Sequence, residues 1–203
     1  MSAGGDARQF APATARNREF ILDVLRRVLP AAGTVLEIGS GSGEHAVYFG
    51  AALPALTWLP SEGNAAALDS IRAWIAHAGV ANVAAPLLLD ATAPSWPLAR
   101  ADALVAINVI HYSPWETTPA LLAGAARLLP PGGVFYCYGP YRRHGAHTAP
   151  SNESFDQWLK ERDPRFGVRD LEVVEAEAQA CGLCLDEVIE MPANNFSLVF
   201  RRG

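Results

Sequence analysis

Apolar residues recur at helical spacing near the start of the chain. Ile21, Leu25 and Val28 fall on one face of a helix that we expect to begin at Thr14, and Pro30 marks its end. Further along, short apolar runs without this period are typical of buried strands. These runs cover residues 34–38, 56–60, 83–89, 101–110 and 132–138. Each of them is predicted to form a strand.

Helical patterns separate these predicted strands. They cover residues 44–53, 64–79 and 117–129, and the middle one ends at Gly79. A chain in which strands and helices alternate forms a parallel sheet with helices on both faces. The pattern therefore predicts a doubly wound, Rossmann-like α/β fold.

The end of the chain departs from this alternation. After a helix predicted over 170–181, two strand-like segments, 183–191 and 196–202, are separated only by the residues PANN. A connection this short can join only antiparallel strands. We therefore expect a mostly parallel seven-stranded sheet with an antiparallel C-terminal strand. The whole chain, 1–203, is expected to form a single domain, with residues 1–12 flexible.

Composition and charge narrow the classes of function. The 203 residues, half of them hydrophobic, suffice for one sizeable domain. The net charge of −5 disfavours a nucleic-acid partner, for which a basic surface is expected. The apolar runs are too short to cross a membrane, the N-terminus lacks a signal-peptide core, and three cysteines do not make a disulfide framework. These features favour a cytoplasmic protein without nucleic-acid or membrane partners and leave its oligomeric state open.

The segment TVLEIGSGSGEHAVYF joins the first predicted strand to the following helix through three glycines, Gly39, Gly41 and Gly43. Such a loop lets a ligand approach the backbone beside the positive end of a helix. A dinucleotide site would require the pattern G-x-G-x-x-G, and here the pattern is G-x-G-x-G. Glu44 follows the last glycine, and we expect its carboxylate to face and repel a pyrophosphate. The loop therefore points to a different ligand.

Three acidic residues complete this predicted binding site. Glu62 follows the second strand, where a carboxylate can bind both hydroxyls of a ribose. Asp90 ends the third strand and can accept a hydrogen bond from an adenine amino group. Glu37 lies inside the first strand, where a charge needs a partner such as a cationic ligand. A ribose, an adenine and a positive charge without a pyrophosphate describe S-adenosyl-L-methionine.

These motifs resemble the cofactor motifs of class I S-adenosylmethionine-dependent methyltransferases. The chain is more closely similar to a small methyltransferase-like family of undefined substrate, through segments that include ARNREFILDVL, NVIHYSPWE, YGPYRRHG and MPANNFSLVF. Glu62 stands where that family has an aspartate. The resemblance implies that the N-terminal segment folds over the cofactor cleft, so that Arg16 or Asn17 binds the methionine carboxylate. A solvent-exposed face of the helix is the other reading of these residues.

The end of the fourth predicted strand faces the cofactor's methyl group in the resembled fold. Asn108, His111 and Tyr112 are therefore the candidates for catalysis, with Asn108 also facing the cofactor. Trp115 is a candidate for a substrate contact. His111 is either a general base or a histidine hydrogen-bonded at the sheet edge. Tyr112 and Trp115 are either aromatic contacts of the sulfonium or core residues. Methyltransferases that act on nucleobase amino groups usually have a polar residue, two prolines and an aromatic residue at this position. The resemblance therefore implies that this chain, with Asn108-Val-Ile-His111, does not methylate such a group.

The long segment 139–170 is expected to carry function as a lid across the substrate pocket. Tyr138 and Tyr141, at its start, are candidates for substrate contacts. Asn194 and Asn195, in the final hairpin, are either substrate contacts or turn residues. The pairs Cys181/Cys184 and His144/His147 have spacings seen at metal sites, but no further ligands accompany them, and no metal is predicted.

The sequence thus predicts a methyltransferase that uses S-adenosylmethionine to methylate an unidentified small molecule. Two alternatives stay open at this point. One is a protein that binds S-adenosylmethionine without turnover and acts in regulation or interaction. The other is a nicotinamide-dependent oxidoreductase, which Glu44 and the antiparallel last strand disfavour.

Overall fold

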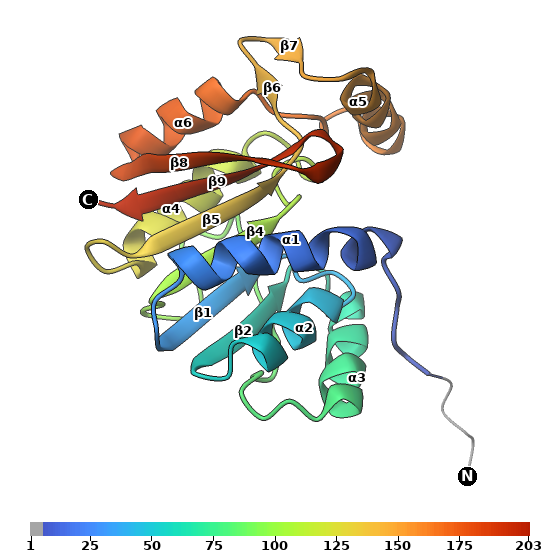
Figure 1. Ribbon diagram of the computed structural model, residues 1–203, viewed down its shortest axis with the longest axis vertical. Helices are drawn as coiled ribbons and strands as arrows, with labels where there is room; N and C mark the ends of the chain where they lie inside the picture. The colour runs from blue at the N-terminus through green and yellow to red at the C-terminus, as the bar shows by residue number, and fades with distance from the viewer. Residues whose placement is uncertain (1–5) are drawn as a thin grey trace.

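Seven strands form the central sheet of the computed structural model, which describes residues 6–203 (Figure 1). The strand order is β3-β2-β1-β4-β5-β9-β8. The strands are β1 (Gly33–Ile38), β2 (Leu56–Glu62), β3 (Leu87–Leu88), β4 (Ala103–Ile107), β5 (Val134–Gly139), β8 (Leu183–Met191) and β9 (Asn195–Arg202). The first five pair in parallel, whereas β9 runs antiparallel to both β5 and β8. The predicted fold class is confirmed, including the antiparallel C-terminal strand.

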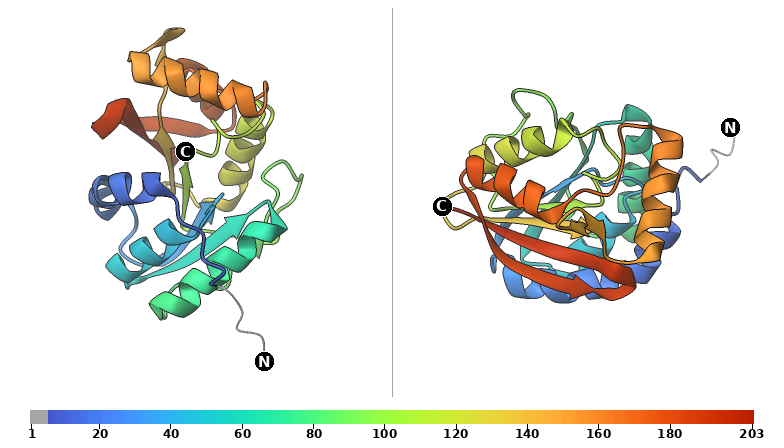
Figure 2. Two further views of the ribbon diagram at one scale, coloured as in Figure 1. Left: turned by 90° about the vertical axis from the view of Figure 1, so that its right-hand side faces the viewer. Right: turned by 90° about the horizontal axis from the view of Figure 1, so that it is seen from above.

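Helices cover both faces of this sheet (Figures 1 and 2). One face packs against α1 (Pro12–Val28) and α2 (Glu44–Ala52), with α3 (Leu68–Ala78) beside α2. The other face packs against α4 (Thr117–Leu128) and α6 (Leu171–Ala180). Because β1, β4, β5 and β9 lie between these two layers, their side chains enter both cores.

Local chemistry explains where the first helix begins. Pro12 occupies the first turn of α1, where its missing N–H costs nothing and its fixed φ suits the helix. The helix therefore starts two residues before the expected Thr14. Ile21 and Leu25 are fully buried on its inner face, as their spacing predicts. Before α1, Trp74 donates a hydrogen bond to the carbonyl of Gln9 at 2.8 Å, so this stretch is held against α3.

The expectation of a flexible N-terminus covers residues 1–12. Residues 1–5 lie outside the described part of the chain. Within residues 6–203, no helix is long and apolar enough to span a bilayer.

The third strand is much shorter than the run 83–89 suggests. Only Leu87 and Leu88 pair with β2, and Val83 makes an isolated bridge to Trp58. Pro86 lies between these two contacts and has no N–H to donate to a strand ladder. The apolar run is therefore interrupted as a strand.

The segment 139–170 contains structure that the sequence pattern does not predict. The strands β6 (Arg142–Arg143) and β7 (Ala146–His147) form a small antiparallel hairpin, and α5 (Pro150–Arg162) follows it. Figure 2 shows α5 as a separate layer beyond the ends of the parallel strands. Two of the three buried side chains of α5 are polar, Asn152 and Asp156, so this helix lacks the apolar stripe by which amphipathic helices are found.

Candidate active site

A cavity of about 540 Å³ opens at the carboxyl ends of the parallel strands. This is the edge at which open α/β sheets bind ligands. Its wall includes Gly39 and Gly41 after β1, Glu62 at the end of β2, Asp90 after β3 and Asn108 after β4. Five residues that the sequence pattern singles out thus meet around one space. We refer to it as the first cavity.

The three loop glycines have separate roles. All have a positive φ, which favours glycine: 65° at Gly39, 54° at Gly41 and 93° at Gly43. A Cβ atom on Gly41 would enter open space beside the first cavity, since no atom lies within 4 Å of it. A Cβ atom on Gly43 would lie 2.8 Å from the Cα atom of Ile71. Gly43 does not line the cavity, so it serves the packing of α2 against α3.

Glu62 connects the end of β2 to the glycine loop. One carboxylate oxygen accepts a hydrogen bond from the backbone N–H of Gly41 at 3.0 Å, and the other accepts one from Asn64 at 3.1 Å. These two bonds fix the carboxylate at the wall of the cavity. A carboxylate has about four lone-pair sites, so acceptor capacity is left for a ligand.

Asp90 is held at the wall of the first cavity by Thr92. Its Oδ1 atom accepts hydrogen bonds from the Thr92 hydroxyl at 2.7 Å and the Thr92 N–H at 2.8 Å. The hydrogen bonds from Thr92 lower the pKa of Asp90, so the side chain is a carboxylate at neutral pH. Two fixed acceptors, Glu62 and Asp90, therefore line the same space.

Glu37 does not contribute to the wall of the first cavity. The side chain is buried and its Oε2 atom accepts a hydrogen bond from the indole N–H of Trp58 at 2.9 Å. Burial raises the pKa of Glu37 to about 7, although the Trp58 hydrogen bond lowers it. The partner expected for this charge was a cationic ligand, and the structure supplies Trp58 instead.

Glu44 was expected to face the ligand, and its carboxylate points elsewhere. Its carboxylate accepts hydrogen bonds from the backbone N–H of Ala11 and from the Ser42 hydroxyl. It therefore holds the start of α1 against α2 and does not face the ligand space. The expected repulsion of a pyrophosphate by Glu44 is not seen in this geometry.

The N-terminal part of α1 covers the first cavity. Ala13, Thr14 and Asn17 line it, and the Asn17 side-chain oxygen lies 2.9 Å from Nε2 of His45. Partial burial, with the positive charge of Arg18 nearby, lowers the pKa of His45 to about 4, so this ring is neutral. This segment therefore lies over the cleft as expected, and a contact of Asn17 with the cofactor stays a prediction.

A second cavity, of about 820 Å³, adjoins the first. It lies between α1, α5 and the turn that precedes β9. Four residues line both spaces: Ala13, Asn17, Asn108 and Tyr112. The two cavities therefore meet at a junction formed by these side chains.

The second cavity collects several of the residues expected to contact a substrate. Tyr138, Asn194 and Asn195 line it together with Tyr112. Asn194 also has a left-handed backbone, with a φ of 57°, so it is both a turn residue and part of the wall. Arg16 lines the second cavity and not the first, which places it away from the expected methionine carboxylate.

Trp115 and Tyr141 line neither cavity. Trp115 packs against the core between the sheet and α4, and the Arg169 guanidinium lies 5.7 Å from its ring centre. Tyr141 is fully buried in the same core. Both aromatic side chains thus lie in the core, which was the alternative interpretation of Trp115. Neither lines a cavity in which a substrate could contact it.

His111 is also outside both cavities. It is fully buried, and its Nδ1 atom accepts a hydrogen bond from the backbone N–H of Arg169 at 3.3 Å. Burial and the positive charge of Arg169 lower its pKa to about 3. The ring is therefore neutral and connects the loop after β4 to the segment before α6. This placement corresponds to the hydrogen-bonded histidine and not to a general base.

Asn108 has a strained backbone at the junction of the cavities. Its φ is 60°, a left-handed value that is uncommon for residues other than glycine. The conformation is fixed because its N–H donates to the carbonyl of Tyr138 at 2.7 Å and its carbonyl accepts from the N–H of His111 at 3.1 Å. Strained residues of this kind cluster at functional sites.

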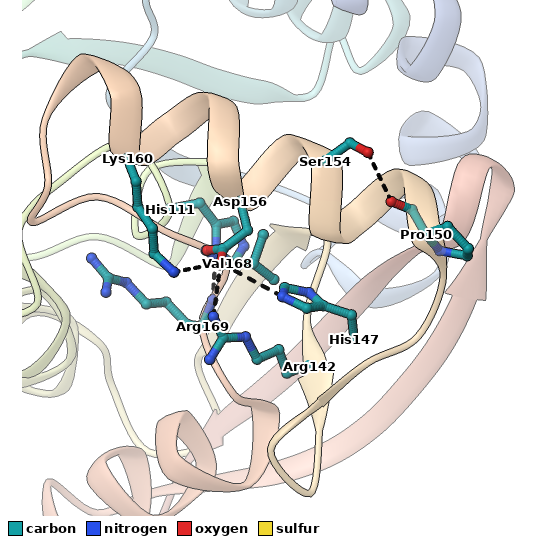
Figure 3. A network of polar contacts seen from close by, with 9 residues as sticks. All are labelled: His111, Arg142, His147, Pro150, Ser154, Asp156, Lys160, Val168 and Arg169. Atoms are coloured by element: carbon teal, nitrogen blue, oxygen red, sulfur yellow. Dashed lines mark hydrogen bonds and ion pairs between the residues drawn. The ribbon is translucent and has the colours of Figure 1, made fainter.

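A network around Asp156 holds α5 over the second cavity (Figure 3). The buried carboxylate accepts hydrogen bonds from Lys160 at 2.6 Å, from the N–H of Val168 at 2.7 Å and from Arg142 at 2.9 Å. Figure 3 shows Arg142 and Val168 reaching Asp156 from outside α5, whereas Lys160 lies one turn along the same helix. The network fixes the helix that contributes Phe155 and Trp158 to the cavity wall.

Several wall residues were not expected from the sequence. His45 follows the glycine loop on α2, whereas Phe20 comes from α1 and Phe155 and Trp158 from α5. A signal for His45 existed, since it lies directly after Gly43-Glu44 at the start of a helix. No local pattern connects the three aromatic residues, which only the folded chain brings together.

Among residues 6–203, no group of three or more His, Cys, Asp or Glu side chains is arranged to hold a metal ion. Cys181 and Cys184 are both free thiols.

Comparison with a model of the family described as "Protein of unknown function (DUF938)" gives a match over residues 8–202. The chain belongs to this family. Solved structures with the same fold carry methyltransferase names. An O-methyltransferase family protein from Burkholderia thailandensis superposes with a TM-score of 0.80 at 17% identity, covering 94% of this chain and 57% of that one.

Two further structures are similar. CalO1, a methyltransferase of calicheamicin biosynthesis with S-adenosylhomocysteine (SAH) bound, gives a TM-score of 0.74 at 20% identity, over 94% of this chain and 55% of its own. A protein from Galdieria sulphuraria is described as a candidate sarcosine dimethylglycine methyltransferase. It superposes with a TM-score of 0.76 at 14% identity, covering 97% of this chain and 92% of that one. The chain spans only a little over half the length of the first two structures. These likenesses show the fold of S-adenosylmethionine-dependent methyltransferases.

Proposed function

We propose that the protein is an S-adenosylmethionine-dependent methyltransferase whose acceptor is a small molecule. One observation carries this proposal: a cavity of the kind that binds the cofactor opens through Asn17, Asn108 and Tyr112 into a second cavity. A methyltransferase needs two such spaces, because cofactor and acceptor must be in contact while water is kept away.

The residues of the first cavity fit the cofactor. Gly41 leaves open space where any other residue would place a Cβ atom, so a ligand can approach the backbone. Glu62 is fixed where it can accept hydrogen bonds from ribose hydroxyls, and Asp90 is fixed where it can accept one from an adenine amino group. Asn17 is one of the junction residues, and its side chain suits the methionine end of the cofactor. When bound, S-adenosylmethionine supplies an already activated methyl group.

The second cavity favours a catalytic protein over one that only binds the cofactor. Its volume of about 820 Å³ lies within the range typical of small-molecule sites, and its wall includes five aromatic side chains among polar and small ones. Some of the similar structures are named for small-molecule methylation, such as CalO1 and the mitomycin 7-O-methyltransferase MmcR. A cytoplasmic location stays a prediction from the sequence.

Turnover is the test of this proposal. We would incubate the protein with methyl-labelled S-adenosylmethionine and a small-molecule extract, and follow labelled products by mass spectrometry. We expect label in a low-molecular-weight product and SAH formed in equal amount, with both reduced in the variant Glu62→Ala at subsaturating S-adenosylmethionine. Persistent absence of transfer by a protein that still binds SAH would favour the non-catalytic binding role.

A further inference from the structure

Among residues 6–203, one charged side chain lines the second cavity, and it is positive: the exposed Arg16. None of the Asp, Glu or His side chains in this part of the chain lines it. Two arginines in the last turn of α1 are both paired. Arg26 lies 3.6 Å from Asp23, and Arg27 lies 2.7 Å from Glu187. Within residues 6–203, Arg16 takes part in none of the twelve ion pairs from Arg8–Asp6 to Arg201–Asp186. A guanidinium that faces a cavity without a counterion is suited to bind an anion.

The same cavity has flat aromatic walls. Tyr112 has its ring centre 5.8 Å from that of Phe155 and 5.9 Å from that of Trp158. Phe155 and Trp158 are stacked, with ring centres 5.6 Å apart and planes at 20°. Aromatic rings in such arrangements pack favourably against the rings of a ligand. This aromatic wall therefore favours a ligand that has an aromatic ring of its own.

Among the described residues, those at the junction between the cavities include no group that takes a proton near neutral pH. Its polar side chains are those of Asn17, Asn108 and Tyr112. Burial raises the pKa of Tyr112 above its ordinary value of 10, and the same cause raises the pKa of Tyr138 in the adjoining wall. An acceptor atom at the junction must therefore be nucleophilic when it arrives.

We infer that the acceptor is a planar aromatic compound carrying a carboxylate or similar anionic group, which Arg16 binds, and that its reacting atom needs no general base. The inference rests on the proposed function. The acceptor atom uses its own lone pair to form the bond to the methyl carbon, and the electron pair of the broken carbon–sulfur bond stays on sulfur. An oxygen or sulfur acceptor enters as the anion. A neutral amine becomes an ammonium ion and releases its proton to water.

Three probe compounds that share one ring system separate charge from shape: 2-naphthoate, its neutral amide 2-naphthamide and the cation 2-naphthylmethylammonium. Their binding to the full chain is measured by isothermal titration calorimetry with SAH saturating. We expect naphthoate to bind more tightly than the amide, and the amide more tightly than the cation. In Arg16→Gln, naphthoate should lose on the order of ten- to a hundredfold in affinity, as for a hydrogen-bonded charge, and the amide should be unaffected.

Two further variants serve as controls. Arg26→Gln removes an arginine from the same helix outside the cavity and should leave all three affinities unchanged. Trp158→Leu removes an aromatic wall and should weaken naphthoate and the amide alike. Equal affinities of the three probes, tighter binding of the cation, or an anion preference that survives in Arg16→Gln would overturn the inference.

The outcomes also separate this inference from the proposed function. If SAH binds while none of the three probes does, the acceptor class is wrong and the cofactor site stands. If SAH itself does not bind, the proposed function is wrong.

Discussion

The carboxylate of Glu62 accepts a hydrogen bond from the backbone N–H of Gly41 at 3.0 Å. The end of β2 and the glycine loop after β1 are therefore fixed relative to each other before any ligand binds. Sites formed in advance in this way lose less entropy on binding than sites that must be ordered by the ligand. The bond also explains why these two residues act together in the proposed cofactor site.

The glycine loop offers a matched pair of substitutions. Gly41 and Gly43 both have a positive φ, so Gly→Ala should cost each a similar backbone strain of about 1–2 kcal/mol. Gly43→Ala should cost about 1–3 kcal/mol more in the free energy of unfolding, because its Cβ atom would meet Ile71. Gly41→Ala should instead lose SAH affinity, because its Cβ atom would enter the cavity. Urea unfolding and calorimetry on both variants measure the two effects, and the same profile in both would contradict this division of roles.

Asp156 should control how firmly α5 is held. Asp156→Asn removes the charge that Arg142 and Lys160 contact, and we expect a local loss of about 1–3 kcal/mol. Hydrogen exchange should become faster in residues 150–162 and stay unchanged in β4. Asp163→Asn is the control, since Asp163 is paired only with Arg165 on the surface. Unchanged exchange in α5 would show that the network does not hold the helix.

Glu37 should make the stability of the protein depend on pH. In the unfolded chain its pKa is near 4.5, and burial raises it to about 7 in the folded protein. Between these values the folded state binds more protons than the unfolded state, so this residue's contribution to stability falls as the pH rises from 4.5 to 7. The variant Glu37→Gln has no carboxyl group at this position, so its stability lacks this dependence on pH.

The measurement for Glu37 compares two pH values. We expect the free energy of unfolding of Glu37→Gln, relative to wild type, to increase by about 3 kcal/mol from pH 4.5 to above pH 7. Urea unfolding at pH 5 and pH 8 covers most of this range. An equal difference between the two proteins at both pH values would mean that Glu37 is not protonated in the folded state as its burial requires.

The sequence was sufficient for the fold class and for part of the first cavity, although Glu37 and Gly43 lie outside its wall and His45 was not expected there. Gly39 and Gly41 follow directly on an apolar strand, and Glu62 and Asp90 end the two strands beyond it, so local pattern and the rules of parallel sheets placed them at one edge. The antiparallel last strand followed from a connection of four residues. These features depend on short stretches of chain, which local patterns describe well.

The second cavity could be predicted only in part. Its wall combines Phe20, Tyr138 and Trp158 from three elements far apart in the sequence. The buried face of α5 is polar, so apolar periodicity did not reveal the helix. Whether Tyr141 and His111 point into a cavity or into the core depends on the packing of segment 139–170, and no local pattern encodes that direction.

The proposed cofactor site is tested most directly by isothermal titration calorimetry of SAH binding to the full chain. We expect one molecule to bind per chain, with affinity lower by on the order of ten- to a hundredfold in Glu62→Ala and in Asp90→Ala, because each loses a hydrogen bond to a charged acceptor. Asp69→Ala on the surface of α3 should bind like wild type. Binding of NAD or NADP in place of SAH, or SAH affinity unchanged in both site variants, would contradict the assignment of this cavity.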